Sequence, residues 1–269
     1  MKNRIKKILI AAVWLLSGTV YAQRDTISLN NGWAFSIDKK GEGVSKKWFA
    51  EPLPNARSVQ LPHTWNIEAE NENHYGWGWY QRKLEIPANW KNKNVVVRFG
   101  AINHSSFIYL NGEKIGEHIG DGFNAFTLNF TGKLRYGKEN ILTIAVNNDY
   151  GRNKVPFGSS FDWPNDGGLI RKVMLIVSDR PAADYIRVTP VLNVNTHEGK
   201  LNIKLGFTGL KDSSQLQLAI TITEENQQTQ QTIYQRTQKP GWQNNEAVVD
   251  IVLPKINPWH FDRPDLYRI

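Results

Sequence analysis

The feature that most constrains the fold is the spacing of apolar residues beyond residue 22, which come in short runs ended by Gly, Asn, Asp or Pro. Such runs predict strands, and none keeps the 3.6-residue period of a helix. Asn111-Gly112 separates two runs and suits both left-handed positions of a type I′ turn, so we expect a tight hairpin there. The clearest predicted strands of the first half are 95–99, 107–110, 114–117, 126–130, 141–146 and 171–177.

A change of composition near Ser178–Pro181 divides the chain, because Gln and Asn become frequent and Trp rare beyond it. Many short strands with closely spaced turns predict an all-β protein made of sandwiches or barrels. An immunoglobulin-like sandwich usually needs about seven strands, and the second half offers five before the sequence stops inside another apparent strand. We therefore expect a truncated second domain. Its predicted strands are 185–190, 201–207, 215–223, 231–236 and 247–253.

The first 22 residues predict a secretory signal peptide, with four basic residues before the short apolar stretch Ile8–Val20 and a small residue, Ala22, at the cleavage point. We expect export to the periplasm or cell surface of a bacterium. The stretch is short for a membrane span, so the alternative, a membrane anchor, is less favoured. Removing the segment lowers the net charge from +8 to +4 and leaves scattered basic residues, which predicts no nucleic-acid partner.

Cysteine is absent from the sequence. This excludes disulfides, cysteine nucleophiles and thiolate metal sites. No cluster of His, Asp and Glu has the spacing of zinc ligands, and no Gly-rich phosphate loop follows a predicted strand. We therefore expect no cofactor and no metal held by this chain alone.

Seven short motifs follow one another along the chain after the signal peptide. They are Asn31–Phe35, Leu61–Trp65, Gly78–Arg82, Leu110–His118, Gly122–Phe126, Asp166–Val173 and Pro258–Tyr267. In this order they resemble the N-terminal part of glycoside hydrolase family 2, the family of β-galactosidases, β-glucuronidases and β-mannosidases. The chain departs from the family pattern at Thr64, where an Asp is usual.

After the predicted signal peptide at 1–22, the resemblance implies a jelly-roll sugar-binding domain of the galactose-binding type at 23–180 and an immunoglobulin-like sandwich at 181–269. In the family a TIM barrel follows and carries both catalytic glutamates. The intact protein would cleave a terminal β-linked sugar, a β-galactoside first among them, with retention of configuration. This chain would supply no catalytic residue; the resemblance leaves open a sodium or magnesium ion and a homo-oligomeric state for the intact enzyme.

Four residues are the candidates for sugar contact. Asp162 stands where family members project a carboxylate toward the sugar, and in some of them that residue helps hold sodium; the alternative is a turn-forming Asp. Trp163 could stack on a sugar ring or pack against protein. Asn73 and His74 lie in the 66–76 loop, which contacts substrate in the family, although ordinary loop residues would look the same. His63 is expected to hydrogen-bond nearby backbone.

Two other classes of protein fit the same residues. A free-standing carbohydrate-binding module would bind sugars without a barrel, since a jelly roll does not by itself choose a function. An adhesion sandwich would bind no sugar at all. We favour the glycosidase interpretation because the seven motifs cover nearly the whole mature chain.

Overall fold

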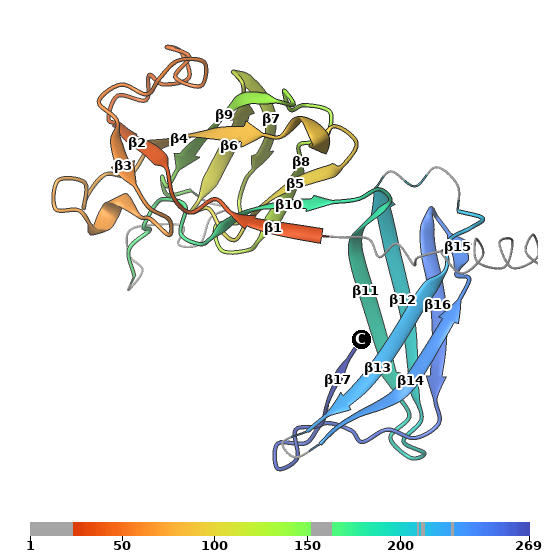
Figure 1. Cartoon of the computed structure of the whole chain (residues 1–269). Helices are drawn as coiled ribbons and strands as arrows, with labels where there is room; N and C mark the ends of the chain where they lie inside the picture. Colours follow the sequence, from red (N-terminus) through yellow and green to blue (C-terminus); the bar gives the residue numbers. More distant parts are fainter. Residues whose placement is uncertain (1–23, 152–162, 209, 211–212, 227–228) are drawn as a thin grey trace, which may run out of the picture. The chain divides into compact units, whose positions relative to one another are not determined.

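A computed structural model describes residues 24–151, 163–208, 210, 213–226 and 229–269 (Figure 1). The predicted signal peptide and Asp162 lie outside these residues. Within them the chain forms seventeen strands, all paired antiparallel, and no α-helix; two single 3-10 turns, η1 (Trp65–Ile67) and η2 (Ala88–Trp90), complete the list. The all-β prediction is confirmed. The chain divides into two compact units, residues 1–179 and 180–269.

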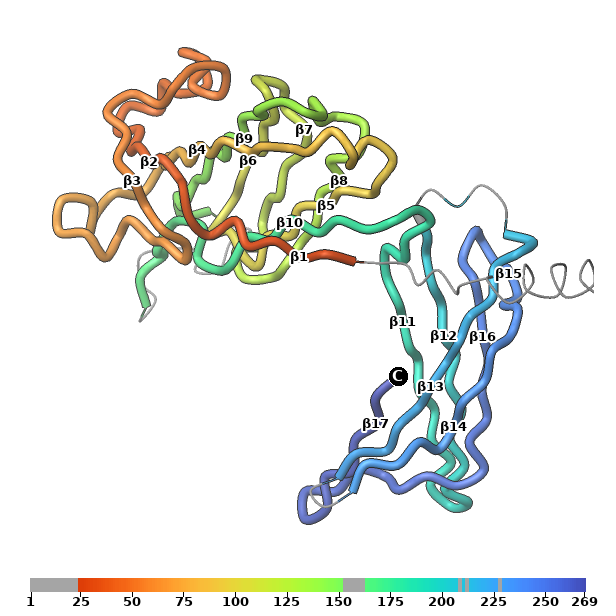
Figure 2. Tube along the Cα trace, viewed as in Figure 1, coloured from red at the N-terminus to blue at the C-terminus, as the bar shows by residue number. Residues whose placement is uncertain are grey.

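The first unit is a jelly-roll sandwich of two antiparallel sheets. One sheet has the strand order β1-β10-β5-β8, and the other has the order β3-β2-β4-β9-β6-β7. Strands distant in sequence are neighbours in both sheets, as the colours in Figure 2 make visible. The strands are β1 (Arg24–Ser28), β2 (Trp33–Asp38), β3 (Arg57–Val59), β4 (Trp77–Ile86), β5 (Asn94–Phe99), β6 (Ser105–Leu110), β7 (Glu113–His118), β8 (Phe126–Asn129), β9 (Lys138–Asn147) and β10 (Val173–Ser178).

The core between these sheets follows from alternation along the strands. In β9, Leu142, Ile144 and Val146 point into the main core, because every second residue of a strand faces the same side. Ala145 faces the other side, where it joins a smaller apolar cluster with Trp79 and the neighbouring strands. The central strand of the larger sheet is therefore covered on both faces, which explains its nearly continuous apolar run.

The hairpin predicted at Asn111-Gly112 is confirmed. Asn111 and Gly112 have φ angles of 54° and 84°, and Leu110 of β6 pairs with Glu113 of β7. The Asn111 side chain also fixes the turn to the rest of the sheet, since its Oδ1 accepts the Ile141 N–H at 3.0 Å. Turn chemistry and side-chain bonding thus set the same register.

The second unit is an immunoglobulin-like sandwich with the sheets β11-β12-β16-β15 and β14-β13-β17. Alternate residues of β12 and β16, such as Ile203 and Val249, are buried between them. The described residues include no helix long and apolar enough to cross a membrane. The strands are β11 (Ala182–Leu192), β12 (Gly199–Thr208), β13 (Leu218–Glu225), β14 (Gln230–Gln238), β15 (Gly241–Gln243), β16 (Glu246–Leu253) and β17 (Leu266–Arg268).

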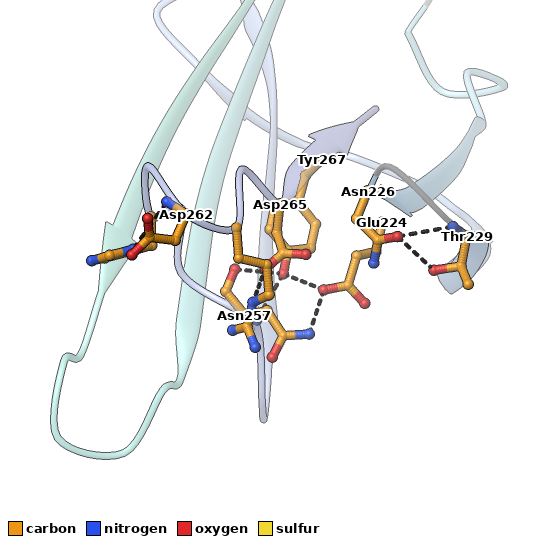
Figure 3. A network of polar contacts seen from close by, with 9 residues as sticks. Glu224, Asn226, Thr229, Asn257, Asp262, Asp265 and Tyr267 are labelled. Carbon is orange, nitrogen blue, oxygen red and sulfur yellow. Dashed lines mark hydrogen bonds and ion pairs between the residues drawn. The ribbon is translucent and has the colours of Figure 1, made fainter.

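A polar cluster anchors the last strand of this unit. The Tyr267 hydroxyl donates to Glu224 Oε1 at 2.8 Å and accepts the Asn257 N–H at 2.8 Å (Figure 3). Burial raises the pKa of Tyr267 most, and together with the hydrogen bond to Glu224 it brings this pKa to about 12. The hydroxyl therefore stays neutral and keeps its donor role at ordinary pH.

Candidate functional site

The 66–76 loop is the first element of the candidate site, and it is folded around one buried asparagine. Asn66 Nδ2 lies 3.0 Å from the carbonyl oxygen of Glu72 and 3.1 Å from that of His74. Backbone bonds from the Asn71 N–H to Glu68 and from the His74 N–H to Asn71 form two successive turns. A single side chain that binds several loop carbonyls replaces the regular pairing that a loop lacks.

Asn148, just after β9, joins this loop to a distant segment. Its Oδ1 accepts the Gly76 N–H at 2.9 Å, and its Nδ2 donates to Asn66 Oδ1 at 3.1 Å and to the Asn165 carbonyl at 2.7 Å. The Gly167 N–H also donates to Asn66 Oδ1 at 2.8 Å. The 66–76 loop and the 163–168 segment are thereby held against each other.

Asn103, two residues before β6, extends the network. Its Nδ2 donates to Asn165 Oδ1 at 3.0 Å and to the Asp166 carbonyl at 2.7 Å. Asn66, Asn103, Asn148 and Asn165 are all buried. A network of buried amides whose donors are satisfied is rigid, because each lost bond would leave a polar group without water. We call these four residues the asparagine network.

Trp65 forms the apolar floor under the network. It is fully buried, stacks on Phe35 with ring centroids 5.9 Å apart, and donates its indole N–H to the His74 carbonyl at 3.1 Å. Gly167 lies so close that a Cβ there would come within 2.1 Å of the Trp65 ring. Only glycine allows the 163–168 segment to approach this far.

The predicted contact residues on the loop have different surroundings. Asn73 is exposed, and its side chain makes no hydrogen bond to another described residue. His74 is half-buried, with Nε2 3.1 Å from the Trp77 carbonyl, so Nε2 donates to that oxygen. Asn73 is therefore available to a ligand, while His74 is partly used to hold the loop. Their role in sugar contact stays a prediction.

The second predicted contact segment is described only from Trp163 onward. Trp163 is 45% exposed, which is a large apolar surface for one side chain. Two residues later, Asn165 enters the asparagine network. Asp162 itself lies outside the described residues, so its predicted contact with sugar stays a prediction.

Two tyrosines and a carboxylate beside these segments were not singled out from the sequence. The rings of Tyr75 and Tyr150 are 4.9 Å apart, and their hydroxyls hydrogen-bond. That bond, burial and nearby negative charge raise the pKa of Tyr75 to about 12. Burial also raises the pKa of the Asp166 carboxyl. Phenol and carboxyl groups suit sugar hydroxyls, but a single Tyr inside the 66–76 loop and another three residues after β9 give no distinctive sequence signal.

His63 makes contacts other than the expected backbone bonds. Its Nδ1 is 2.7 Å from the Tyr80 hydroxyl and its Nε2 is 3.0 Å from Glu68 Oε1, so that expectation is wrong. Glu68 also pairs with Arg57 and accepts from Asn71. Burial lowers the pKa of His63, which favours a neutral ring in the folded protein. Through Glu68 and Asn71, these contacts of His63 and Arg57 hold the first part of the 66–76 loop in place.

The described residues contain no group of three His, Cys, Asp or Glu side chains placed to hold a metal ion. What the candidate site does offer is a rigid surface with amide, phenol, carboxyl and indole groups. Such groups bind hydroxyl-rich ligands through hydrogen bonds and ring stacking.

Comparisons with known proteins find similar chains among β-glucuronidases and β-galactosidases. The β-glucuronidase of Bacteroides fragilis is 29% identical over 220 residues, which are 78% of this chain and 30% of that protein. The β-galactosidase of Thermoanaerobacterium thermosulfurigenes is 28% identical over 260 residues, 91% of this chain and 34% of that protein. The chain therefore spans about a third of the length of the curated relatives it matches.

Solved structures agree on the architecture. A β-glucuronidase from an uncultured Clostridium has a TM-score of 0.72 at 26% identity, covering 91% of this chain and 42% of that one. The Ruminococcus gnavus β-glucuronidase in complex with D-glucaro 1,5-lactone, with a TM-score of 0.69 at 21% identity over 91% of this chain and 41% of that one, shares the fold. The family model for the sugar binding domain of glycosyl hydrolases family 2 matches residues 26–178. With more than half of its length under that model, the chain belongs to glycosyl hydrolase family 2.

Proposed function

We propose that this chain is the non-catalytic N-terminal portion of an exported glycoside hydrolase that cleaves terminal β-linked sugars. Family membership supports the reaction class. Retaining hydrolysis needs two carboxyl groups about 5–5.5 Å apart, and we assign no such pair to this chain. The reacting carboxyl groups would come from a catalytic domain beyond residue 269. The two sandwiches described here would support that domain.

The asparagine network is the observation that carries the proposed role of the first unit. It joins the 66–76 loop to the 163–168 segment, the two places where sugar contacts are predicted, through bonds of 2.7–3.1 Å. A ligand held by both segments would meet a preorganised surface and lose little free energy to ordering it. Asn73, Trp163 and Asp162 would then orient the sugar while the catalytic domain cleaves it.

Two classes of substrate are supported by named relatives. The sequence motifs led us to expect a β-galactoside, and the Thermoanaerobacterium relative is a β-galactosidase. β-Glucuronides are the second candidate, favoured by the relative from Bacteroides fragilis and by the Clostridium structure at 26% identity. Both are terminal β-linked sugars, and they differ at two positions. In a glucuronide a carboxylate replaces the hydroxymethyl group at C6, and the hydroxyl at C4 has the opposite orientation.

The test begins with the gene. The reading frame past the codon for Ile269 is expected to encode a barrel with two catalytic carboxylates, and a stop codon with no such domain downstream would contradict the proposal. If the barrel is present, the complete enzyme is assayed on nitrophenyl β-galactoside and β-glucuronide.

Variants of the complete enzyme then test the contact residues. Asn73→Ala and Trp163→Ala should each lower kcat/KM by about tenfold or more, because each removes a group that orients the sugar. Asn92→Ala is the matched control, since Asn92 is an exposed turn asparagine of the same unit. Kinetics of both contact variants equal to those of the control would overturn the assigned role.

A further inference from the structure

A groove in the first unit is not used by the candidate site. It has a volume of about 470 Å³ and lies where β3 leaves β2. β3 pairs with β2 only over Trp33–Phe35, so among the described residues no strand covers that edge of β2 from Ser36 onward. The volume is in the range typical of small-ligand pockets, which is roughly 300–1,000 Å³.

The walls of the groove are held by specific bonds. The buried carboxylate of Asp38 accepts the N–H groups of Glu42 at 2.9 Å and of Gly43 at 2.7 Å, which fixes the segment that carries Trp48. On the other wall, the Ser36 hydroxyl donates to the Pro54 carbonyl at 2.7 Å. The groove is therefore a formed feature of the fold.

The lining combines rings with polar groups. Phe35 contributes to the floor, with the Arg57 guanidinium 5.1 Å above its ring. Trp48 is half-buried and packs edge-on against Trp79 at 5.9 Å, which orients its indole. Asn55, Glu70 and Asn71 also line the groove. An oriented indole beside hydrogen-bonding side chains suits a sugar ring, and the mixed lining disfavours a purely apolar ligand.

The charges of the lining favour an acidic ligand. Three cations, Lys39, Lys46 and Arg57, stand against one carboxylate, Glu70. Lys46 and Arg57 pair with Glu42 and Glu68, which lie outside the lining. The Lys46–Glu42 pair is exposed, so it is weak and easily exchanged for another anion. Lys39 is exposed and forms no ion pair with any other described residue.

We propose that this groove is a second saccharide-binding site, which takes an oligosaccharide carrying carboxylate groups, with a sugar ring against Trp48 and a carboxylate at Lys39. The site is separate from the predicted sugar contacts: of the 66–76 loop, Glu70 and Asn71 line the groove, whereas Asn73 and His74 do not. The proposal does not depend on glycoside hydrolysis, because it concerns binding by the sugar binding domain alone.

Calorimetry on the purified chain tests the proposal with two probes of equal length. A hyaluronan tetrasaccharide, which carries glucuronate, should bind about tenfold or more tightly than neutral chitotetraose. Raising the ionic strength from about 0.02 to 0.3 M should weaken the acidic probe several-fold, since screening acts on exposed charges. Equal affinity for both probes, or no binding heat for either, would overturn the proposal.

Variants locate the binding. Lys39→Gln should weaken the acidic probe about fivefold, as expected for one exposed charge contact, and it removes no interaction of the fold. Lys133→Gln is the matched control, because Lys133 is an exposed lysine outside the groove. Trp48→Ala should abolish binding of the acidic probe, provided that its thermal transition shows a folded protein. If Lys39→Gln and Lys133→Gln bind the acidic probe equally, the groove is not its site.

Discussion

Truncating Asn148 should destabilise the first unit far more than a typical asparagine substitution. The side chain is fully buried and makes four hydrogen bonds, at 2.7, 2.9, 3.1 and 3.5 Å. In Asn148→Ala, the Gly76 N–H and the Asn165 carbonyl lose these partners, whereas Asn66 Oδ1 keeps the Gly167 N–H. Leaving two buried groups unsatisfied at ~1–3 kcal/mol each gives a loss of about 4 kcal/mol in the free energy of unfolding.

Thermal unfolding followed by tryptophan fluorescence measures this loss. Seven of the ten tryptophans lie within residues 24–179, so the signal reports mainly on the first unit. For a domain of this size, about 4 kcal/mol corresponds to a decrease in Tm of roughly 8–16 °C. A chain of two units can unfold in two steps. Where a separate transition of the second unit is resolved, its Tm should not change and serves as an internal reference.

A second variant separates hydrogen bonding from cavity formation. Asn148→Asp keeps the shape but replaces the Nδ2 donor by an oxygen that faces the Asn66 and Asn165 oxygens. It should destabilise at least as much as alanine at pH 7, because a buried carboxylate without donors is costly. Asn92→Ala, at an exposed turn, should change the free energy of unfolding by less than about 0.5 kcal/mol. A loss below about 1 kcal/mol for both Asn148 variants would refute the rigid network.

Three further outcomes are expected. Gly167→Ala should cost about 3 kcal/mol in thermal melts, because its Cβ would overlap the Trp65 ring, and an unchanged Tm would contradict the close approach. The pKa of His63 is lowered in the folded state, so the unfolded chain binds more protons and the free energy of unfolding should fall below pH ~6.5. Urea titrations at several pH values should show a shallower fall for His63→Gln than for the unchanged protein. The pKa of Tyr267 is raised to about 12, so the second unit should lose stability above pH ~10; Tyr267→Phe should remove this alkaline loss and cost about 1 kcal/mol at pH 7, while an alkaline loss that persists would implicate another group.

The strand pattern could be predicted because it depends on alternation and turn residues. The hairpin at Asn111-Gly112 needs two residues with left-handed backbone, and Asn and Gly are the residue types that adopt this conformation most readily, so two adjacent residues are enough to predict it. β1 was not predicted, because Arg24–Ser28 is exposed along its length and is a strand only through its pairing with β10. β13 begins at Leu218, three residues after the predicted start, where pairing with β14 begins. Ends set by a partner strand leave no local signal.

The candidate site was harder to predict than the fold. Loop asparagines read as turn formers, and nothing local distinguishes Asn73, which is exposed, from Asn66, which is buried and binds several carbonyls. The partners of Asn66 lie 82 and 101 residues away, at Asn148 and Gly167. His63 shows the same limit, since its partner Tyr80 lies 17 residues away in β4. Long-range polar contacts of this kind need the fold before they can be assigned.

The most direct test of the account is an activity assay of the purified 269-residue chain. With nitrophenyl β-galactoside and nitrophenyl β-glucuronide, we expect release of nitrophenol at the rate of the buffer blank, since the chain would hold sugar but not the reacting carboxyl pair. Turnover that co-purifies with the chain and disappears when one of its own Asp or Glu residues is replaced by the amide would contradict the division of labour proposed here.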